Sequence, residues 1–442
     1  MTSATHPLRQ VYRFNKPRQA IRLYHGRIGG LAAKDLRGRV ELRCVPDISI
    51  DWTVDDPFES PQFANRRDEV PLLLHRRRGN VELPSHARGI EGGWSNGATF
   101  GNDNAPLDRV IAHWFNLPNW HGPISLEETT AAGEHRLWLG RWVLEAEGWL
   151  ITLDVRHDHS AVWTDLQKSD VRVMTHVMEI RRADGSAFTA REAEPALAAM
   201  QIGMSFALGR WVAPLLPVGL DSTGAAAWED WRPGFCDPGR VAGVGWWYEQ
   251  DHAALSEFLK LLVSAFTDPD RRERLWMQMV LAITAVGAPG FIEHRIMVGF
   301  SGIEHLLWQQ LVLTGLLTDD AYRKAEAANK LRDVLTAASI PAGIDSGLQP
   351  VIANLATVKK ADGLNLDGAG AVAWTRNRLI HPKAGRLEAY QYPGLLIEVW
   401  LLLRHYLVLL ILHSIGYKNS YRDLRVLEQM TSTTVPVPWA NL

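Results

Sequence analysis

The segment Leu395–His413, LLIEVWLLLRHYLVLLILH, is a long apolar stretch, and its role decides which fold the surrounding sequence can adopt. A helix that crosses a bilayer needs about 20 successive apolar residues. Glu398, Arg404 and His405 interrupt this stretch, and ionisable residues are rare within membrane spans. We therefore predict a helix from Leu395 to about Ile415 that is buried in a helical bundle or at a subunit interface, and we expect no membrane partner.

Apolar residues recur at helical spacing through most of the sequence after about residue 250. Besides the apolar helix, the predicted helices span about 255–266, Arg271–Val286, Ile292–Thr314, Ala321–Ser339, Leu348–Lys360 and a stretch that begins near Gly368. The sequence thus predicts an all-α bundle over residues 246–425 and a non-helical tail over residues 426–442.

In the first half of the chain the dominant period is two, which is typical of strands with one buried face. Apolar residues alternate with polar ones in Ile48–Val54 and again in Trp149–Val155. Short strands interrupted by Gly and Pro favour an antiparallel sandwich or a distorted barrel. The predicted fold class is therefore α+β, with a β-rich N-terminal domain over residues 1–245 followed by the helical bundle.

Two local patterns stand out in this β-rich half. Gly89–Pro106, GIEGGWSNGATFGNDNAP, is rich in Gly and Asn and is predicted to be an exposed loop. It lacks the Gly-Lys-Ser/Thr ending of a phosphate-binding loop. Thr189 and Glu192 have the spacing of a capping box, which predicts the start of a helix, although Pro195 could displace that start.

Composition excludes several classes of protein. The 442 residues carry a formal net charge of -2, so a site for a polyanion must be built from a few local cations. Only two cysteines, Cys44 and Cys236, are present and they are far apart in sequence, which excludes a disulfide framework and a cysteine-based zinc site. The first residues contain no apolar core, so we expect no signal peptide and a cytoplasmic location.

A second stretch of the sequence contains the candidate catalytic residues. Trp374–Pro382 reads WTRNRLIHP and contains the unit Arg376-Asn377-x-x-x-His381. Asn377 and His381 are four residues apart and share a helix face. Because a residue before proline is disfavoured in the helical region, His381 is predicted to lie at the helix end, where its ring can turn towards Arg376.

These residue types suit phosphate chemistry. A helix C-terminus favours a protonated imidazole, so His381 could act as general base or acid. Arg376 offers a planar charged fork for a phosphate or a phosphorane-like transition state, and Asn377 could hold His381 or the substrate. Arg378, Lys383 and Arg386 add local positive charge for substrate binding.

No acidic cluster with metal-ligand spacing accompanies these residues, so we expect no metal and no other cofactor. A histidine and an arginine acting on RNA imply attack by the neighbouring 2′-hydroxyl, which leaves a 2′,3′-cyclic phosphate and a 5′-hydroxyl. The alternative is structural: Arg376 and Arg378 are surface residues and His381 caps the helix. Glu304 could face the motif helix, but a solvated glutamate is the commoner case, so it is not included in the predicted site.

The stretch RNRLIHP, late in a helical bundle and followed by an apolar helix ending in Ile415-Gly416-Tyr417, resembles a HEPN domain, and more narrowly the ApeA-like HEPN proteins of bacterial anti-phage defence. Arg376, Asn377 and His381 fit the family signature of an arginine, a polar residue and a later histidine. The resemblance covers roughly residues 250–420. A weaker one extends to HWFNLPNW (113–120) and THVMEIRRADG (175–185) in the first half.

The resemblance implies a metal-independent endoribonuclease that dimerises through its bundle, so that two Arg/His motifs share one cleft. It implies a toxic effector of abortive infection whose RNA substrate could be tRNA. A phage-derived or protein trigger would then act on the N-terminal domain. Two alternatives remain at this stage. One is a non-catalytic RNA- or nucleotide-binding HEPN module, and the other is a ligand- or protein-sensing β-rich domain for which the bundle only provides dimerisation.

Overall fold

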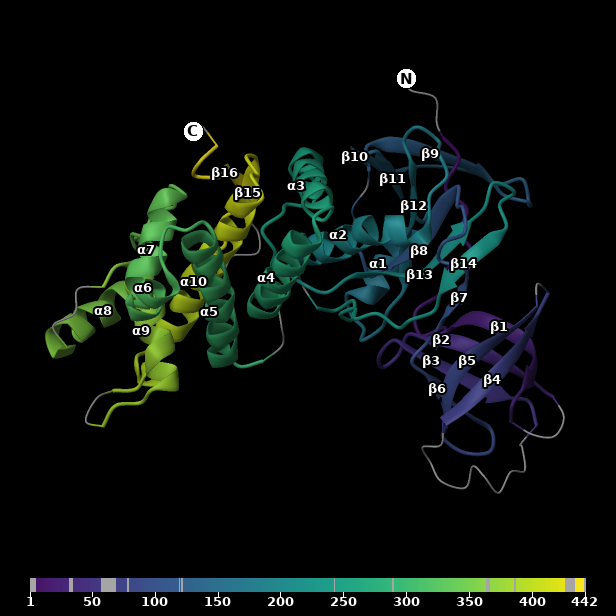
Figure 1. Cartoon of the computed structure of the whole chain (residues 1–442), viewed down its shortest axis with the longest axis horizontal. Helices are drawn as coiled ribbons and strands as arrows, with labels where there is room; N and C mark the ends of the chain where they lie inside the picture. The colour runs from purple at the N-terminus through teal and green to yellow at the C-terminus, as the bar shows by residue number, and fades with distance from the viewer. Residues whose placement is uncertain are drawn as a thin grey trace. The chain divides into compact units, whose positions relative to one another are not determined.

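The computed structural model describes residues 5–31, 35–56, 69–77, 79–118, 120, 122–241, 243–287, 290–362, 366–384, 387–425 and 434–440. The chain divides into two compact units, which are described separately (Figure 1). The first comprises Met1–Gln201 and Trp211–Ala242, and the second comprises Ile202–Arg210 and Gly243–Leu442. The second unit therefore includes residues 202–210, which the sequence assigned to the β-rich domain.

A closed barrel of six antiparallel strands forms one part of the first unit. Its strands, in barrel order, are β1 (Ile21–Gly29), β2 (Leu36–Arg43), β3 (Ser49–Val54), β6 (Gly92–Ser95), β5 (Gly79–Ala87) and β4 (Glu69–Arg76). The barrel closes where β1 pairs with β4, with Ile28 opposite Leu74. Because side chains alternate between the two faces of a strand, Val40, Ile50 and Trp52 all enter a buried interior.

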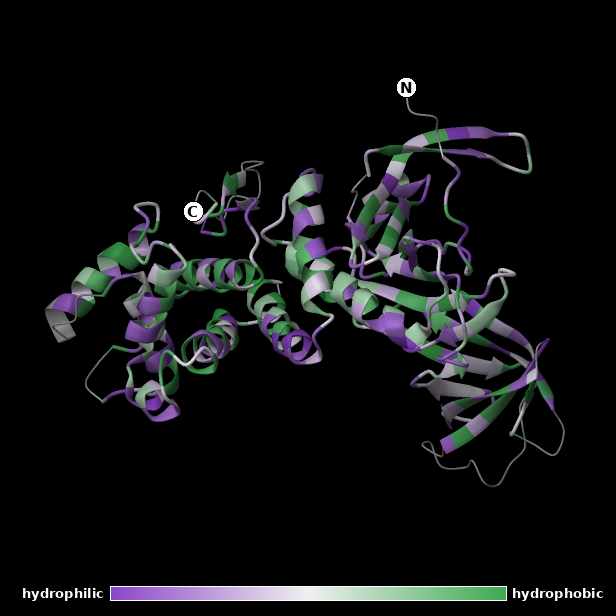
Figure 2. Ribbon diagram, turned by 45° about the horizontal axis from the view of Figure 1, so that its top comes forward, coloured by the Kyte–Doolittle hydropathy of each residue, from purple (hydrophilic) through white to green (hydrophobic). Residues whose placement is uncertain are grey.

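An eight-stranded antiparallel sheet forms the rest of the β structure. Its order is β7 (Thr99–Gly101), β14 (Ala226–Asp230), β13 (Ala213–Leu220), β8 (Arg109–Phe115), β12 (Met174–Arg182), β11 (Trp149–Val155), β10 (His135–Ala146) and β9 (Ile124–Thr129). Hydrophobic and hydrophilic bands alternate along its long strands in Figure 2. Phe115, Met174 and Leu215 share one core with the barrel. The predicted antiparallel β-rich N-terminal region is thus confirmed, as a barrel joined to a sheet.

Two helices accompany the sheet, α1 (His159–Leu166) and α2 (Ala190–Leu208). The backbone N–H of Thr189 donates to Glu192 Oε2 at 2.7 Å, and the Glu192 N–H donates to Thr189 Oγ1 at 3.3 Å. This is the predicted capping box, and the helix continues through Pro195.

The prediction of a loop over Gly89–Pro106 is wrong. This stretch contributes β6 to the barrel and β7 to the sheet. Glycine occurs here because the strands approach closely: a Cβ on Gly93 would meet the carbonyl oxygen of His86 on the neighbouring strand at 1.8 Å. Gly93 therefore reports a cross-strand contact, whereas Gly97 and Gly101, with φ of 87° and 82°, occupy the left-handed region that favours glycine.

The second unit is helical, as predicted. Its helices are α3 (His252–Ala265), α4 (Pro269–Gly287), α5 (Ile292–Trp308), α6 (Asp319–Lys324), α7 (Ala327–Ala337), α8 (Gln349–Asp362), α9 (Gly368–Ile380) and α10 (Leu395–Ser414). A π-helical turn, η2 (Gln309–Leu313), extends α5, and a 3-10 turn, η3 (Ala389–Gln391), precedes α10. The helix predicted over Ala321–Ser339 is broken at Ala325, where the backbone becomes extended.

The apolar helix α10 packs against α4, α5, α8 and α9. Its polar residues find partners within the same unit: Glu398 accepts the Val351 N–H at 2.8 Å, and Arg404 Nε donates to the Leu424 carbonyl at 2.8 Å. By length and hydropathy, α10 is the described helix that could cross a membrane, and 89% of its apolar window is buried inside the chain. Such burial is expected of a core helix.

The terminal segment folds back onto the second unit. Among its described residues, β16 (Thr434–Pro436) pairs with β15 (Ser420–Arg422), and Trp439 Nε1 donates to the Tyr417 carbonyl at 2.6 Å. The sequence predicted a tail here because the pairing partner lies outside the segment itself.

The close approach of Gly93 to the His86 carbonyl leads to a prediction about the stability of the barrel. Gly93→Ala should lower the free energy of unfolding by about 1–3 kcal/mol, because the added methyl must displace the backbone of β5. Urea unfolding of the full chain measures the change. Gly89→Ala is the control, since a Cβ there meets nothing within 4 Å and should change stability by no more than about 0.5 kcal/mol. Equal effects of both substitutions would contradict the packing argument.

Candidate functional site

The motif helix α9 is fixed at its start by a strong cap. Asp367 accepts the Gly370 N–H at 2.8 Å and forms two hydrogen bonds, at 2.6 and 2.9 Å, with the guanidinium of Arg332 on α7. Burial acts to raise the pKa of Asp367, but the hydrogen bonds from Arg332 and Gly370 outweigh it and hold the pKa below its usual range. A Cβ on Gly368 would meet the Tyr406 hydroxyl at 2.2 Å, so the small residues at the start of α9 permit close packing on α10.

Arg376 is held near the end of α9 by three contacts. Its Nη1 donates to Asn377 Oδ1 at 3.0 Å, and its Nη2 lies 3.6 Å from Glu304 Oε2 on α5. Its guanidinium also lies over the Phe300 ring, 5.3 Å from the centroid. A quarter of the side chain remains exposed, so part of the guanidinium can meet a ligand from solvent.

His381 lies just beyond the helix, as predicted. Its φ and ψ are −123° and 77°, outside the helical region, and Pro382 follows it. The His381 N–H donates to the Asn377 carbonyl at 2.8 Å. Its side chain is exposed and makes no hydrogen bond to the residues that the structure describes. Asn377 therefore connects both predicted catalytic residues, through its side chain to Arg376 and through its backbone to His381.

Glu304 also belongs to this site, although it was not among the predicted site residues. It comes from α5, and its carboxylate faces Arg376, while its backbone carbonyl accepts the Tyr322 hydroxyl at 3.2 Å. Helical spacing places Glu304 on a face of α5, but the sequence gives no rotation of α5 relative to α9. The contact between Glu304 and Arg376 therefore depends on how α5 and α9 pack, which the sequence pattern does not reveal.

The three additional cations are not equivalent. Arg378 is buried, and its guanidinium lies 5.5 Å from the Trp374 ring centroid. It lines a cavity of about 380 Å³ together with Glu293, Glu388 and Tyr390. Lys383 is exposed on the segment after α9.

The third cation of this group, Arg386, lies outside the described residues. Of the two described cations predicted to bind substrate, Lys383 is exposed at the surface, whereas Arg378 is buried and lines the cavity.

The arrangement combines an exposed imidazole with a guanidinium that is three-quarters buried and bonded to the Asn377 amide. A guanidinium can stabilise a developing phosphorane charge, and an imidazole can move a proton, which together are the functional groups of phosphoryl transfer without a bound metal. Among the residues described, no group of three or more His, Cys, Asp or Glu side chains is arranged to hold a metal ion.

Comparison with known proteins finds two family models that each match part of the chain. Residues 102–242 match the family model described as YopA central domain, and residues 271–434 match YopA C-terminal domain. The second match includes the whole Arg376–His381 motif. The chain is also 25% identical over 304 residues to the SPbeta prophage-derived uncharacterized protein YopA of Bacillus subtilis (strain 168).

This alignment covers 68% of the present chain and 66% of the relative. No solved structure matches the chain significantly. None of these descriptions names a HEPN domain or a nuclease, so the predicted HEPN resemblance rests on the sequence motifs alone.

The cap at Asp367 predicts how acid affects the motif helix. Asp367→Ala should lower the free energy of unfolding by about 0.5–2 kcal/mol at pH 7, and Asp367→Asn by less, since an amide oxygen can still cap. The carboxyl has a lower pKa in the folded state than in the unfolded chain, so its contribution is present above about pH 4 and is lost as the pH falls.

The difference between wild type and Asp367→Ala should therefore narrow between pH 7 and pH 3, which urea titrations at a series of pH values measure. A difference that stays constant over this range would show that the Asp367 charge does not contribute.

Proposed function

We propose that the second unit is a metal-independent endoribonuclease of the HEPN type. The observation that carries the proposal is that the Arg376 guanidinium is held near the open end of α9 by Asn377 Oδ1 and by Glu304, while the His381 side chain at the same helix end is exposed. The HEPN resemblance of this stretch supplies the reaction class.

The proposed reaction is transesterification at an RNA phosphodiester. The 2′-hydroxyl attacks phosphorus, its O2′–P bond forms as the P–O5′ bond breaks, and a 2′,3′-cyclic phosphate and a 5′-hydroxyl result. One His381 imidazole accepts the 2′-hydroxyl proton, and a second, protonated imidazole donates a proton to the departing O5′. Arg376 stabilises the charge on the non-bridging oxygens of the pentavalent transition state.

The two imidazoles come from the two protomers of a homodimer, in which both copies of α9 face a common RNA segment. Lys383, exposed beside each motif, would contact the backbone of the substrate. The biological role that we propose is a toxic cytoplasmic effector of anti-phage defence, with tRNA as a candidate substrate and with a trigger acting on the β-rich unit. The prophage origin of the Bacillus relative fits a role in conflict between phages and bacteria.

One observation favours a second function, non-catalytic binding of RNA or nucleotides. The carboxylate of Glu304 partly neutralises Arg376, and Arg378 is buried. These features reduce the positive charge available to a transition state, while Lys383 and the exposed part of Arg376 could still bind phosphate. Such a module would bind RNA with a strong dependence on salt and would release no cyclic-phosphate product.

Substitution of either motif residue should abolish cleavage. Purified protein is incubated with total cellular RNA in excess EDTA, and the product ends are analysed. Arg376→Ala and His381→Ala should each lower the cleavage rate by about 10²–10⁴-fold, because each removes a group that acts on the reacting phosphate. Arg323→Ala and His294→Ala, which remove exposed residues of the same unit, should cleave as the wild type does.

Cyclic-phosphate ends that appear with the wild type and the two control variants, but not with Arg376→Ala or His381→Ala, would support the proposal. Cleavage that persists in both motif variants would overturn it. RNA binding without cleavage by any of the proteins, even with lysate of phage-infected cells added, would favour the binding module.

Glu304 is proposed to act through Arg376, as a positioning residue. Glu304→Gln should lower kcat by about tenfold with little change in KM, because an arginine that is held less firmly stabilises the transition state less well. Glu304→Asp, which keeps the charge, should recover part of the rate. An unchanged kcat for Glu304→Gln would show that the 3.6 Å contact has no part in the reaction.

A further inference from the structure

The first described residues of the chain form a strap across the large sheet of the first unit. This strap, residues 5–15, starts with a parallel bridge between Thr5 and β9. The Leu8 N–H then donates to Asp154 Oδ2 on β11 at 2.7 Å, and the Val11 N–H donates to His113 Nε2 on β8 at 3.2 Å. Burial lowers the pKa of His113 to about 4, so its neutral ring can accept this bond.

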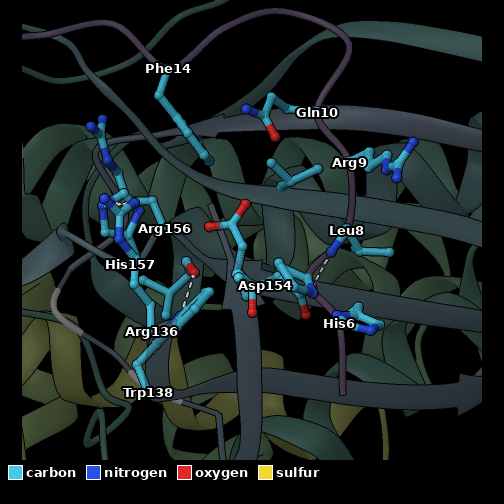
Figure 3. Close-up of a pocket in the computed structure, with 15 residues that line it drawn as sticks. His6, Leu8, Arg9, Gln10, Phe14, Arg136, Trp138, Asp154, Arg156 and His157 are labelled. Atoms are coloured by element: carbon cyan, nitrogen blue, oxygen red, sulfur yellow. Dashed lines mark hydrogen bonds between the residues drawn. The ribbon is translucent and has the colours of Figure 1, made fainter. Parts of the chain in front are cut away.

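A cavity of about 500 Å³ lies between the strap and strands β9 to β12. Figure 3 shows strap residues His6 to Gln10 along one side, with Arg136, Trp138 and His157 on the other. Phe14 and Trp138 supply aromatic surface, and Glu128 on β9 supplies a carboxylate. The volume lies in the range of small-molecule sites, which are about 300–1,000 Å³.

The walls of this cavity contain buried charges that are fully paired within the protein. The Asp154 side chain is 3% exposed and accepts two hydrogen bonds from Arg141, both at 2.7 Å, besides the Leu8 N–H. The Arg156 side chain is 6% exposed and binds Asp158 through Nε and Nη2, while Nη1 donates to two backbone carbonyls. These pairs fix the shape of the walls and leave little charge for a ligand.

Arg136, His157 and Glu128 are among the lining groups that remain available to a ligand, as is the exposed Arg9 on the strap. Arg136 Nη1 contacts His157 Nε2 at 2.9 Å, and its Nη2 contacts Glu134. The other N–H groups of Arg136 have no partner among the described residues. Because a guanidinium only donates, His157 Nε2 must accept, which leaves the Nδ1 proton of this ring as a donor. Within the same described part, Glu128 forms no hydrogen bond or ion pair.

Donors and an acceptor of this kind select complementary groups. Arg136 and His157 together suit an anion, since a guanidinium favours phosphate and carboxylate oxygens. Glu128 suits a group that carries N–H donors, and a carboxylate can accept two adjacent donors at once. Phe14 and Trp138 favour a planar ring, which can stack on an aromatic face.

We propose that this cavity is a binding site for a mononucleotide. The phosphate lies against Arg136 and His157, and the base contacts Glu128 and the aromatic surface. Guanine is the preferred base, because it presents two adjacent N–H donors to one carboxylate where adenine presents a single amino group. The site belongs to the first unit and does not depend on the proposed ribonuclease activity.

Isothermal titration calorimetry of the full chain tests the proposal, with guanosine 5′-monophosphate, adenosine 5′-monophosphate, guanosine and inorganic phosphate as probes. Guanosine 5′-monophosphate should bind at least about tenfold more tightly than each of the other three, since only it satisfies both ends of the site. Arg136→Gln should weaken the binding of this nucleotide and of phosphate by about tenfold or more. Glu128→Gln should weaken the nucleotide and leave phosphate unchanged.

The control is Arg181→Gln, which removes an exposed arginine on β12 that does not line the cavity. It should bind all probes as the wild type does, and thermal unfolding of each variant verifies that it is folded. If guanosine 5′-monophosphate binds no more tightly than inorganic phosphate, the proposed contact between the base and Glu128 is wrong. Equal affinities for wild type and Arg136→Gln, or no binding of any probe, would overturn the site.

Discussion

The burial of α10 is the constraint on which the second unit depends. A helix that is apolar on every side cannot rest on one neighbour, so α4, α5, α8 and α9 must surround it. Its polar residues would be costly inside this core without partners. Several are paired within the chain, although the buried Tyr406 hydroxyl has no hydrogen-bond partner among the described residues. Trp400 Nε1 donates to the Ala285 carbonyl at 2.7 Å, and His405 lies 3.3 Å from Asp423. The motif helix owes its position to this core, because α9 packs directly on α10.

Much of the fold could be predicted because local periodicity reports burial. The stripe through Leu255–Phe266 and the alternation in Trp149–Val155 each became the expected element, α3 and β11. Prediction failed where the deciding contact is distant in sequence. Gly93 was interpreted as part of a loop, but the reason for glycine there is a carbonyl on another strand. The break at Ala325 likewise follows from packing, since the Tyr322 carbonyl near the end of α6 accepts a bond from Lys330 on α7.

The candidate site, too, was predictable where it depends on local sequence and not where it depends on distant contacts. Arg376, Asn377 and His381 lie within one turn and a half of a helix, so their relation followed from spacing and from Pro382. Glu304 could not be placed, because its contact with Arg376 depends on how α5 and α9 pack. The cavity beneath the strap could not be predicted from the sequence for the same reason, since it is assembled from residues up to Phe14 and from Glu128 onwards.

The strap also has a consequence for the order in which the chain can fold during synthesis. The barrel strands lie within Ile21–Ser95 and pair mostly with near neighbours, so the barrel can form early. The strap is synthesised before the barrel, but Asn15 binds the Arg172 carbonyl and Tyr12 accepts from Trp231 Nε1. Those contacts must wait until most of the first unit has left the ribosome. Residues 5–15 are therefore made before the barrel but are among the last to find their native partners, and closing such long loops is a slow step.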